Sequence, residues 1–438
     1  MSTMHDDSMM EMALEGTEQA IGQAEIEETV EQGKVAPLWR NRDFLLLTAG
    51  QAVSLMGSQV SQLAFPLLML ALTHSPAQAG FMAAVRGLPF ALLCLPAGAL
   101  VDRWNRKRVM ILCDVGRALA LGSIPLALLL GHLTFIQLYL VALTEGTLFV
   151  FFNMADAASL PHIVAKKQLP DATAQALLAE SVSNLLGPAF GGLLYGIATM
   201  LPFGADAISY AASVCSLFFI RAEFQEERTA ARKENLWKEI GEGLLWLWHE
   251  PLVRFIAILT GGITFPVVGY GLILIVIAQG QHASSSTIGL IFACGGAGGV
   301  LGALLAGPLQ RRFSFGQMLI GATWVWALTW LLFAIAPNPL ILGIVTALSF
   351  IVVPIYSGTQ YSYRIALIPD ALQGRVNSVF RLIAFGTQPL GLALTGVLLQ
   401  AIGPISTVLA LFLPQFVLCI AVTFNRHVRH AKPIGELQ

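Results

Sequence analysis

Charged residues are scarce in this 438-residue chain, since Asp, Glu, Lys and Arg together make up 12% of it, whereas soluble proteins average about 25%. This shortage excludes an ordinary soluble enzyme, a nucleic-acid-binding protein and a disordered hub. The formal net charge of −1 gives no reason to expect a polyanionic partner. The five cysteines stand singly inside apolar runs, without a CxxC pair, a metal-ligand spacing or a disulfide framework. We therefore expect no metal, no cofactor and no nucleic acid.

Apolar residues, by contrast, make up 56% of the chain, and its mean hydropathy is +0.71. A helix that spans a bilayer needs about 20 apolar residues. Turn formers separate the apolar stretches, and the ends of the fourth and tenth stretches are the least sharply marked. The sequence predicts an all-α membrane protein with twelve spans, near residues 43–72, 78–101, 108–130, 134–158, 172–198, 202–221, 252–279, 286–309, 316–336, 339–363, 373–401 and 404–425.

A polar linker divides the spans into two groups of six. We expect a disordered acidic tail over residues 1–40, a six-helix bundle over 41–221, a linker over 222–251, a second bundle over 252–426 and a tail over 427–438. Apolar residues of the linker recur at helical spacing, which predicts an amphipathic helix. That helix lies either on the membrane surface or against the floor of the bundles. The residues are Leu236, Trp237, Ile240, Leu244, Leu247 and Trp248.

Basic residues lie on one side of the predicted membrane only. The loops of the other side contain no Lys or Arg, and they lie near residues 73–78, 131–134, 199–202, 280–286, 336–340 and 402–405. By the positive-inside rule, both termini and the linker face the cytoplasm. We thus expect a multi-pass protein of the cell membrane, in contact with lipid and monomeric.

An internal repeat links the two halves. Several residues recur in the second half after 208 or 209 residues, at equivalent places in the predicted topology. The pairs are Gly80 and Gly289, Gly87 and Gly296, Gly98 and Gly307, Arg103 and Arg312, and Pro161 and Pro369. Two parallel halves joined by a linker are the architecture of a rocking transporter, which holds its substrate between the halves near the middle of the membrane.

The loop after the second span resembles the loop motif of the major facilitator superfamily. The residues that match are Gly98, Asp102, Arg103, Arg106 and Lys107. Asn105 stands where the motif usually has a second glycine, but Asn tolerates left-handed backbone angles. We predict a conformational latch, in which Gly98 lets another helix approach and Asp102 faces the positive N-terminus of the eleventh span. A generic basic loop is the alternative.

The fifth span contains an element that resembles the antiporter motif of the same superfamily. Its residues are Gly187, Pro188, Gly191 and Gly192, and Ser183 stands where the longest form of the motif has a further glycine. Glycines four apart expose a flat backbone face, and a proline can bend the helix. The element is therefore predicted to seal one end of a central cavity, unless it is only a generic packing face.

Residues 38–425 as a whole are similar to the drug-efflux and siderophore-exporter branch of the superfamily, which includes enterobactin exporters and macrolide-efflux proteins. The resembling stretches are RGLP (86–89), the 98–108 loop, DVGR (114–117), LPHIV (160–164) and IPDALQGRVNS (368–378). This resemblance implies a non-enzymatic exporter of amphiphilic drugs, macrolides or siderophores in a bacterial cytoplasmic membrane, with protons as counter-ion.

The glycine-rich segment 295–299 is followed by no Lys-Ser/Thr, so it is no phosphate loop. A proton gradient is the expected energy source.

Ionisable side chains inside the spans are candidates for proton coupling, because a charge at the centre of a spanning helix costs about 2.5–3.5 kcal/mol. Glu145 and Arg86 are predicted to share a depth and are the first candidates. Access to water could change the protonation of Glu145 during transport. A fixed ion pair that only holds two helices together is an equal alternative. Drug antiporters commonly have an arginine before the glycine in the fourth span, and here Glu145 occupies a similar place.

Other charged residues of the first six spans have further expected roles. Asp206 either caps its helix or titrates from outside, and Glu180 is a secondary candidate without a named partner. Asp114 and Arg117 are three residues apart on one helical face, so we expect them to neutralise each other.

Aromatic and amide side chains offer a lining for a large amphiphile. The candidates are Phe65, Phe152, Asn153, Tyr270, Tyr356, Gln360 and Gln388. The main hypothesis is thus an ion-coupled exporter of amphiphilic small molecules. One alternative is a transporter of lipid such as lysophospholipid on the same scaffold. The other is a membrane receptor or assembly partner that transports nothing.

Overall fold

The computed structural model describes residues 37–101, 103–225, 236–369 and 372–431, which form helices and no β-strand. The predicted acidic tail up to residue 36 lies outside this range. The first half comprises η1 (Leu38–Arg40), α2 (Arg42–Thr73), α3 (Pro76–Val101), α4 (Arg106–Leu129), α5 (Phe135–Ile163), η2 (Lys166–Gln168), α6 (Leu169–Ile197) and α7 (Leu201–Phe219). The linker helix and the second half are α8 (Leu236–His249), α9 (Pro251–Val267), α10 (Tyr270–Gly280), α11 (Ser285–Arg312), α12 (Phe315–Ile335), α13 (Pro339–Leu367), α14 (Gln373–Phe385), α15 (Gln388–Phe424) and α16 (Arg426–Arg429).

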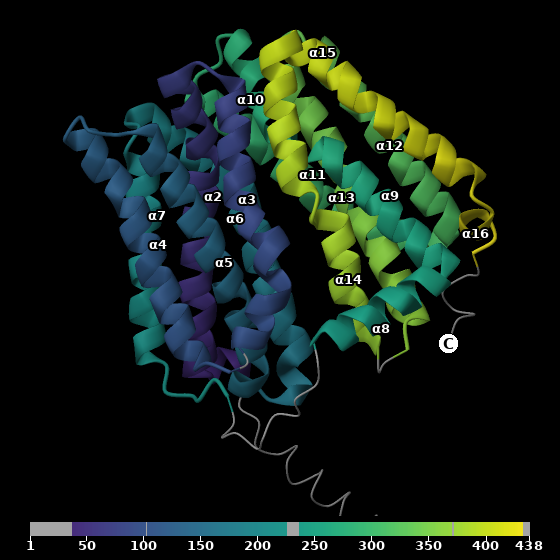
Figure 1. Cartoon of the computed structure of the whole chain (residues 1–438), viewed down its shortest axis with the longest axis horizontal. Coiled ribbons are helices and arrows are strands. Elements are labelled where there is room, and N and C mark those ends of the chain that lie inside the picture. Colours follow the sequence, from purple (N-terminus) through teal and green to yellow (C-terminus); the bar gives the residue numbers. More distant parts are fainter. Residues whose placement is uncertain (1–36, 102, 226–235, 370–371, 432–438) are drawn as a thin grey trace, which may run out of the picture.

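Within the described residues, 11 helical stretches are long and apolar enough to cross a membrane, and the last, Gln373–Phe424, contains two of the predicted spans. Helix α15 turns back at Gly403, where φ is 77° and ψ is 173° (Figure 1). Glycine adopts this left-handed φ without steric cost, and Pro404 follows it. The predicted all-α fold with twelve spans is therefore confirmed. The fourth and tenth spans continue as helix to Ile163 and Leu367.

Two spans that were predicted to be continuous are broken. The seventh span is divided into α9 and α10 at residues 268–269, and the eleventh into α14 and α15 at residues 386–387. Pro389 explains the second break, because its ring clashes with the carbonyl four residues earlier, at the end of α14. The two broken spans pack tightly: a Cβ on Gly269 would lie 2.1 Å from the Thr395 hydroxyl.

The two halves stand side by side and approach each other toward one end of the bundle (Figure 1). We call the end that carries α8 and the 103–105 loop the linker face, and the end that carries residues 74–75 and 198–200 the distal face. Helix α3 of the first half packs on α15 of the second, and α6 packs on α11. In Figure 1 the halves meet toward the distal face at the top and diverge toward α8 at the bottom.

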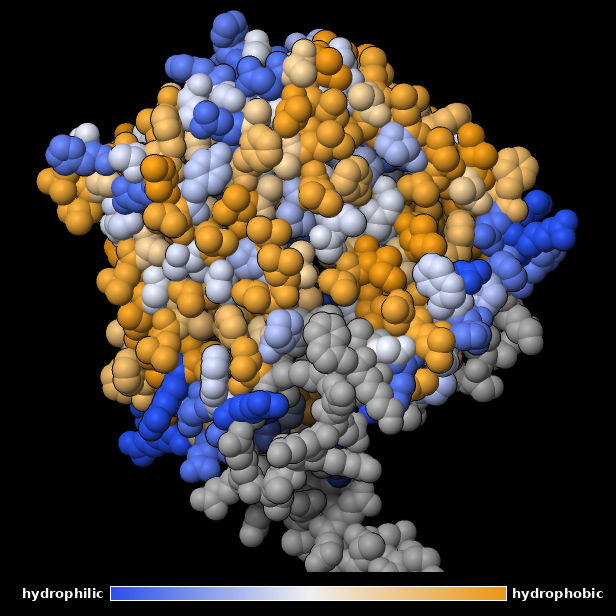
Figure 2. All heavy atoms as spheres, viewed as in Figure 1, coloured by the Kyte–Doolittle hydropathy of each residue, from blue (hydrophilic) through white to orange (hydrophobic). Residues whose placement is uncertain are grey.

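The surface shows how the molecule sits in a bilayer. Figure 2 shows a broad apolar band across the middle of the visible face, with hydrophilic residues gathered toward the two ends. Large apolar side chains in the middle of helices, such as Leu119 of α4 and Ile208 of α7, are about 70% exposed. In water this exposure would be costly, whereas in a membrane lipid covers it.

The linker helix α8 packs on the floor of the second half, which was one of its two predicted placements. Leu247 is fully buried, and a Cβ on Gly243 would lie 2.7 Å from the Arg375 carbonyl oxygen of α14. Glu242 also forms an ion pair with Arg375 at 2.5 Å. Trp248 remains 55% exposed, so the helix keeps an apolar edge at the depth where a membrane surface would meet it.

Candidate transport site

Glycines bring the two halves into backbone contact near the distal face. A Cβ on Gly192 of α6 would lie 2.8 Å from the Cα of Gly289 of α11. In the same way, a Cβ on Gly80 of α3 would lie 2.7 Å from the Cα of Gly396 of α15. No side chain fits at such distances. Because Gly80 and Gly289 are a pair of the internal repeat, the two contacts are equivalent places in the two halves.

The antiporter-like element of α6 packs in two directions at once. A Cβ on Gly187 would lie 2.3 Å from the Cβ of Gln59, and one on Gly191 would lie 2.7 Å from the Val60 carbonyl oxygen, both on α2. Gly192 faces α11 instead, as described above. Pro188 is buried between these contacts. The element thus fixes α6 to its own half while presenting it to the other half at the distal face.

Near the linker face the corresponding glycines are open. A Cβ on Gly98 of α3 or on Gly307 of α11 would meet no atom within 4 Å. The approach of another helix that was predicted at Gly98 is therefore not present in this conformation. The two halves are therefore in contact near the distal face and separated near the linker face.

The basic residues of the loop motif hold helix ends within the first half. The Arg106 guanidinium donates to the carbonyls of Ala158 (2.8 Å) and Phe224 (3.2 Å), and the Lys107 ammonium donates to the Ile220 carbonyl (2.7 Å) at the end of α7. A cation is favourable at Ile220, since the last carbonyls of a helix carry partial negative charge. Arg103 is exposed beside them. Asp102, the predicted latch residue, lies outside the described residues.

A buried charge network occupies the interior of the first half. The Arg86 guanidinium of α3 contacts both carboxylate oxygens of Glu145 of α5, through Nε and, at 3.1 Å, through Nη2. Arg117 of α4 reaches Glu145 at 3.3 Å and Asp114 at 3.5 Å. Glu145, Asp114 and Arg117 are each at most 2% exposed. The structure thus brings Glu145 and Arg86 together and adds Arg117, which the sequence had assigned to Asp114 alone.

Gly146 explains why these groups can meet. A Cβ on Gly146 would lie 2.0 Å from the Arg86 carbonyl oxygen, so the backbones of α3 and α5 touch at this residue. The contact sets Arg86 directly beside Glu145. The network continues from Arg117 to the Tyr210 hydroxyl of α7, which also bonds Ser58 of α2 at 2.8 Å.

Asp206 of α7 is a second buried carboxylate, and it has different partners. It is fully buried and accepts hydrogen bonds from the hydroxyls of Ser61 (2.5 Å) and Ser209 (3.2 Å). Among the described residues, no cation lies within ion-pair distance of it. Asp206 is the sixth residue of α7 and does not cap the helix. Gly57 of α2 gives it room, since a Cβ there would lie 2.7 Å from the carboxylate.

The remaining sequence candidates are scattered. Glu180 is exposed on α6, and Asn153 and Gln388 are half-buried. Phe65 and Phe152 are buried within the first half, under the guanidinium groups of Arg86 and Arg117. Tyr356 is buried in the second half and bonds Thr260 at 2.9 Å, and Gln360 lies beside Arg364.

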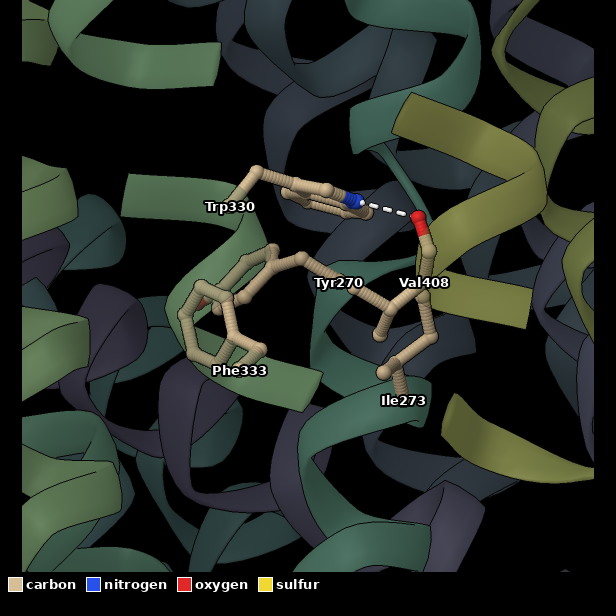
Figure 3. A pocket seen from close by; sticks show the side chains of 5 residues that line it. All are labelled: Tyr270, Ile273, Trp330, Phe333 and Val408. Atoms are coloured by element: carbon tan, nitrogen blue, oxygen red, sulfur yellow. Dashed lines mark hydrogen bonds between the residues drawn. The ribbon is translucent and has the colours of Figure 1, made fainter. Parts of the chain in front are cut away.

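Tyr270 lines a small pocket inside the second half. Its other walls are Ile273, Trp330, Phe333 and Val408, and the Trp330 indole donates to the Val408 carbonyl at 3.0 Å (Figure 3). These side chains come from α10, α12 and α15, so the pocket lies between helices of one half. It is small and mostly apolar, and the indole N–H of Trp330 is already bound to the Val408 carbonyl.

The internal repeat shows that the charge network belongs to the first half alone. The residues 209 positions after Asp114, Arg117, Asp206 and Tyr210 are Thr323, Trp326, Gln415 and Cys419. They pack in an equivalent way, since the Cys419 thiol contacts the Thr323 carbonyl between α15 and α12 at 3.4 Å. The sequence analysis missed Arg117 as a partner of Glu145 and Tyr210 as a partner of Arg117, and comparison at this offset marks both as residues that differ between the halves.

A bundle of twelve spans in two related halves, touching at one end and carrying buried charges in its interior, defines a secondary membrane transporter. Comparison with known proteins agrees. Residues 32–434 match the family described as "Transmembrane secretion effector", and the chain belongs to this family of the major facilitator superfamily. Its members are transporters and not enzymes.

Individual relatives cover nearly the whole chain. The multidrug efflux pump Tap of Mycolicibacterium fortuitum is 29% identical over 406 residues, which cover 88% of this chain and 95% of Tap. The enterobactin exporter EntS of Escherichia coli K12 is 25% identical over 390 residues, with 87% and 92% covered. Among solved structures, a variant of the nucleoside transporter NupG superposes with a TM-score of 0.74 at 12% identity, covering 87% of this chain and 100% of NupG. This last similarity concerns the fold alone.

Proposed function

We propose that this protein is a proton-coupled antiporter that exports amphiphilic small molecules across the bacterial cytoplasmic membrane by alternating access. The similarity to a multidrug efflux pump and to an enterobactin exporter supports the direction and the substrate class. The proton gradient supplies the energy, and no cofactor takes part.

The orientation follows from the charges. The linker face carries Arg106, Lys107 and Arg375, whereas the distal loops contain no Lys or Arg, so the linker face is the cytoplasmic side. The contact of Gly192 with Gly289 is then the closed outer gate, and the molecule faces inward. An exporter collects its substrate in this conformation.

The observation that carries the proposal is the difference between two buried carboxylates of one half. Glu145 is bound by two guanidinium groups, whereas Asp206 meets only hydroxyl groups among the described residues. A buried carboxylate without a direct ion-pair partner is costly inside a membrane protein, while a neutral acid can share its proton with a hydroxyl oxygen. Asp206 is therefore the proposed proton carrier, and the Glu145 network is the charge to which it responds.

The test uses the purified protein in lipid vesicles with ethidium as the amphiphilic probe and a pH dye trapped inside. Wild-type protein should move ethidium against its concentration gradient when a pH gradient is imposed, and added ethidium should move protons. Asp206→Asn should abolish both effects while exchange of ethidium down its gradient continues, because the neutral amide has no proton to release.

Asp171→Asn is the matched control, since Asp171 is an exposed carboxylate in the first turn of α6. It should leave transport unchanged. If Asp206→Asn retains full substrate-driven proton movement, Asp206 is not the carrier. If the wild-type protein moves neither ethidium nor a wider panel of antibiotics and siderophores, the proposed export activity itself is wrong.

A further inference from the structure

Arg364 of α13 is a buried arginine without a carboxylate partner among the described residues. It is 4% exposed, its Nη1 donates to the Gln360 side-chain oxygen at 3.0 Å, and its guanidinium lies 3.7 Å from the centre of the Phe380 ring of α14. Its Nε is buried and makes no hydrogen bond. Arg86 and Arg117 of the first half, by contrast, are both paired with acidic groups.

The distribution of charge makes this arginine unusual. Residues 42–221 contain eight Asp or Glu, whereas residues 251–425 contain six Arg and a single acidic residue, Asp370. Four of these arginines stand at helix ends on the linker face, which leaves Arg364 and Arg381 as the other cations of this half. Arg364 stands in the last turn of α13. A buried charge without a counter-charge is costly, and in a membrane protein it marks a functional site.

A second arginine lies next to it. Arg381 follows Phe380 on α14, is exposed, and places its guanidinium 5.9 Å from the centre of the Phe90 ring of α3, across the boundary between the halves. Arg381 comes directly after Phe380, the ring that the Arg364 guanidinium contacts. Tyr361, which is 52% exposed, flanks Arg364 on the other side at 5.4 Å. Arg364 and Arg381 thus lie beside three aromatic rings, which come from α3, α13 and α14.

We infer that Arg364 and Arg381 form the subsite that binds an oxyanion of the transported molecule, with Phe90 and Tyr361 against its apolar body, while the buried Phe380 ring supports the Arg364 guanidinium. This inference rests on the proposed export function and adds a preference for anionic amphiphiles within its substrate class. A guanidinium presents paired donors that match a carboxylate or phosphate. An oxyanion would supply the counter-charge and the acceptor that Arg364 lacks. A bound anion would neutralise Arg364 and so shift the equilibrium between the inward-facing and outward-facing conformations. Coupling requires a shift of this kind.

The probe pair is N-dansyl-phenylalanine, an anionic amphiphile, and its neutral methyl ester. Binding is measured by dansyl fluorescence on the full-length protein, and efflux is measured from vesicles. Wild-type protein should bind the acid about tenfold or more tightly than the ester. Arg364→Gln should remove this preference while affinity for the ester stays the same. Removing an uncompensated buried charge should not impair folding, and the exposed Arg381→Gln offers a second variant with a smaller loss.

Arg254→Gln is the matched control, because the Arg254 guanidinium lies over the Trp248 ring and donates to the Trp248 carbonyl at the linker face. It should leave the preference unchanged. Equal binding of acid and ester by the wild-type protein, or an equal loss of both in Arg364→Gln, would overturn the inference. If phosphatidylglycerol in the vesicles displaces the acid and the acid is not transported, the site binds a lipid headgroup and the inference is also wrong. The ethidium assay tests the export proposal separately. Loss of ethidium transport with the acid preference intact would count against export, and the reverse result would count against the subsite.

Discussion

Gly192 and Gly289 touch backbone to backbone across the boundary between the two halves. A Cβ on Gly192 would lie 2.3 Å from the Ser285 carbonyl oxygen and 2.8 Å from the Gly289 Cα. Small residues let membrane helices approach closely, because the lipid provides no hydrophobic force that would press larger surfaces together. This contact holds the distal end closed, and it must open if substrate is to leave on that side.

Gly192→Leu should therefore prevent the closed distal gate from forming. The leucine side chain would push α6 and α11 apart, and overpacking of this kind typically costs about 1–3 kcal/mol. We expect transport to be lost while the protein still folds, because the open distal conformation needs no such contact. Labelling of a cysteine introduced near Ser286 should be faster in the variant than in the parent.

Gly280→Ala is the control for this substitution. A Cβ on Gly280 at the end of α10 meets no atom within 4 Å, so transport and labelling should match the parent protein. Normal transport by Gly192→Leu would show that the distal contact is not a gate.

Gly146→Ala should separate the partners of the charge network without changing any charge. The new methyl group would lie 2.0 Å from the Arg86 carbonyl oxygen, which belongs to the backbone and cannot rotate away. We expect the free energy of unfolding to fall by about 1–3 kcal/mol. Gly122→Ala is the matched control in a neighbouring helix, since its Cβ would lie an ordinary 3.8 Å from Ala207. The two variants can be compared by thermal unfolding in detergent, and equal melting temperatures would contradict the role of Gly146.

The sequence predicted the fold well because membrane-spanning helices can be recognised from their apolar composition. Long apolar runs, turn formers and the repeat of Gly80 at Gly289 are local or periodic features, and they located the twelve spans. The breaks in the seventh and eleventh spans were missed. Their cause lies partly in packing between helices, as at Gly269 against Thr395. The composition of an apolar segment does not indicate which helix it will contact.

The candidate site was predicted in part for the same reason. Matching depths suggested that Glu145 and Arg86 could meet, but depth says nothing of the direction in which a side chain points. Arg117 therefore seemed satisfied by Asp114, three residues away, whereas in the fold it also reaches Glu145. The aromatic candidates for a cavity lining, such as Phe65, are buried beneath these arginines, which only tertiary contacts could reveal.

The linker helix offers a further test of packing. Gly243 and Gly241 lie two residues apart on α8, yet a Cβ would lie 2.7 Å from the Arg375 carbonyl at Gly243 and would meet nothing within 4 Å at Gly241. Gly241→Ala should stabilise α8 slightly, since alanine favours a helix by about 0.5–1 kcal/mol over glycine. Gly243→Ala should instead displace α8 from α14. Hydrogen exchange of the α8 amides should slow in the first variant and accelerate in the second, and the same direction in both would refute this packing.

Glu242→Gln should have little effect on the same helix. The ion pair with Arg375 is partly exposed, with side-chain exposures of 40% and 31%, and pairs of this kind contribute about 0–1 kcal/mol. We expect a melting temperature within a degree or two of the parent protein. A large loss of stability would mean that the charge pair, and not the backbone contact at Gly243, holds α8 in place.

The last prediction separates a structural role of Glu145 from a role in coupling. Glu145→Gln leaves Arg86 without a counter-charge and Arg117 with Asp114 alone, and breaking a buried pair in this way costs about 3–5 kcal/mol. If the pair is structural, Glu145→Gln with Arg86→Gln should restore both folding and proton-driven efflux, since Asp114 still neutralises Arg117. If Glu145 carries the proton, the double variant should fold but remain uncoupled. Glu180→Gln makes the same substitution at an exposed position and should change stability little. Proton movement on addition of ethidium to vesicles, measured for all three variants, decides between the two roles, and full coupling in the single variant would exclude Glu145 from both.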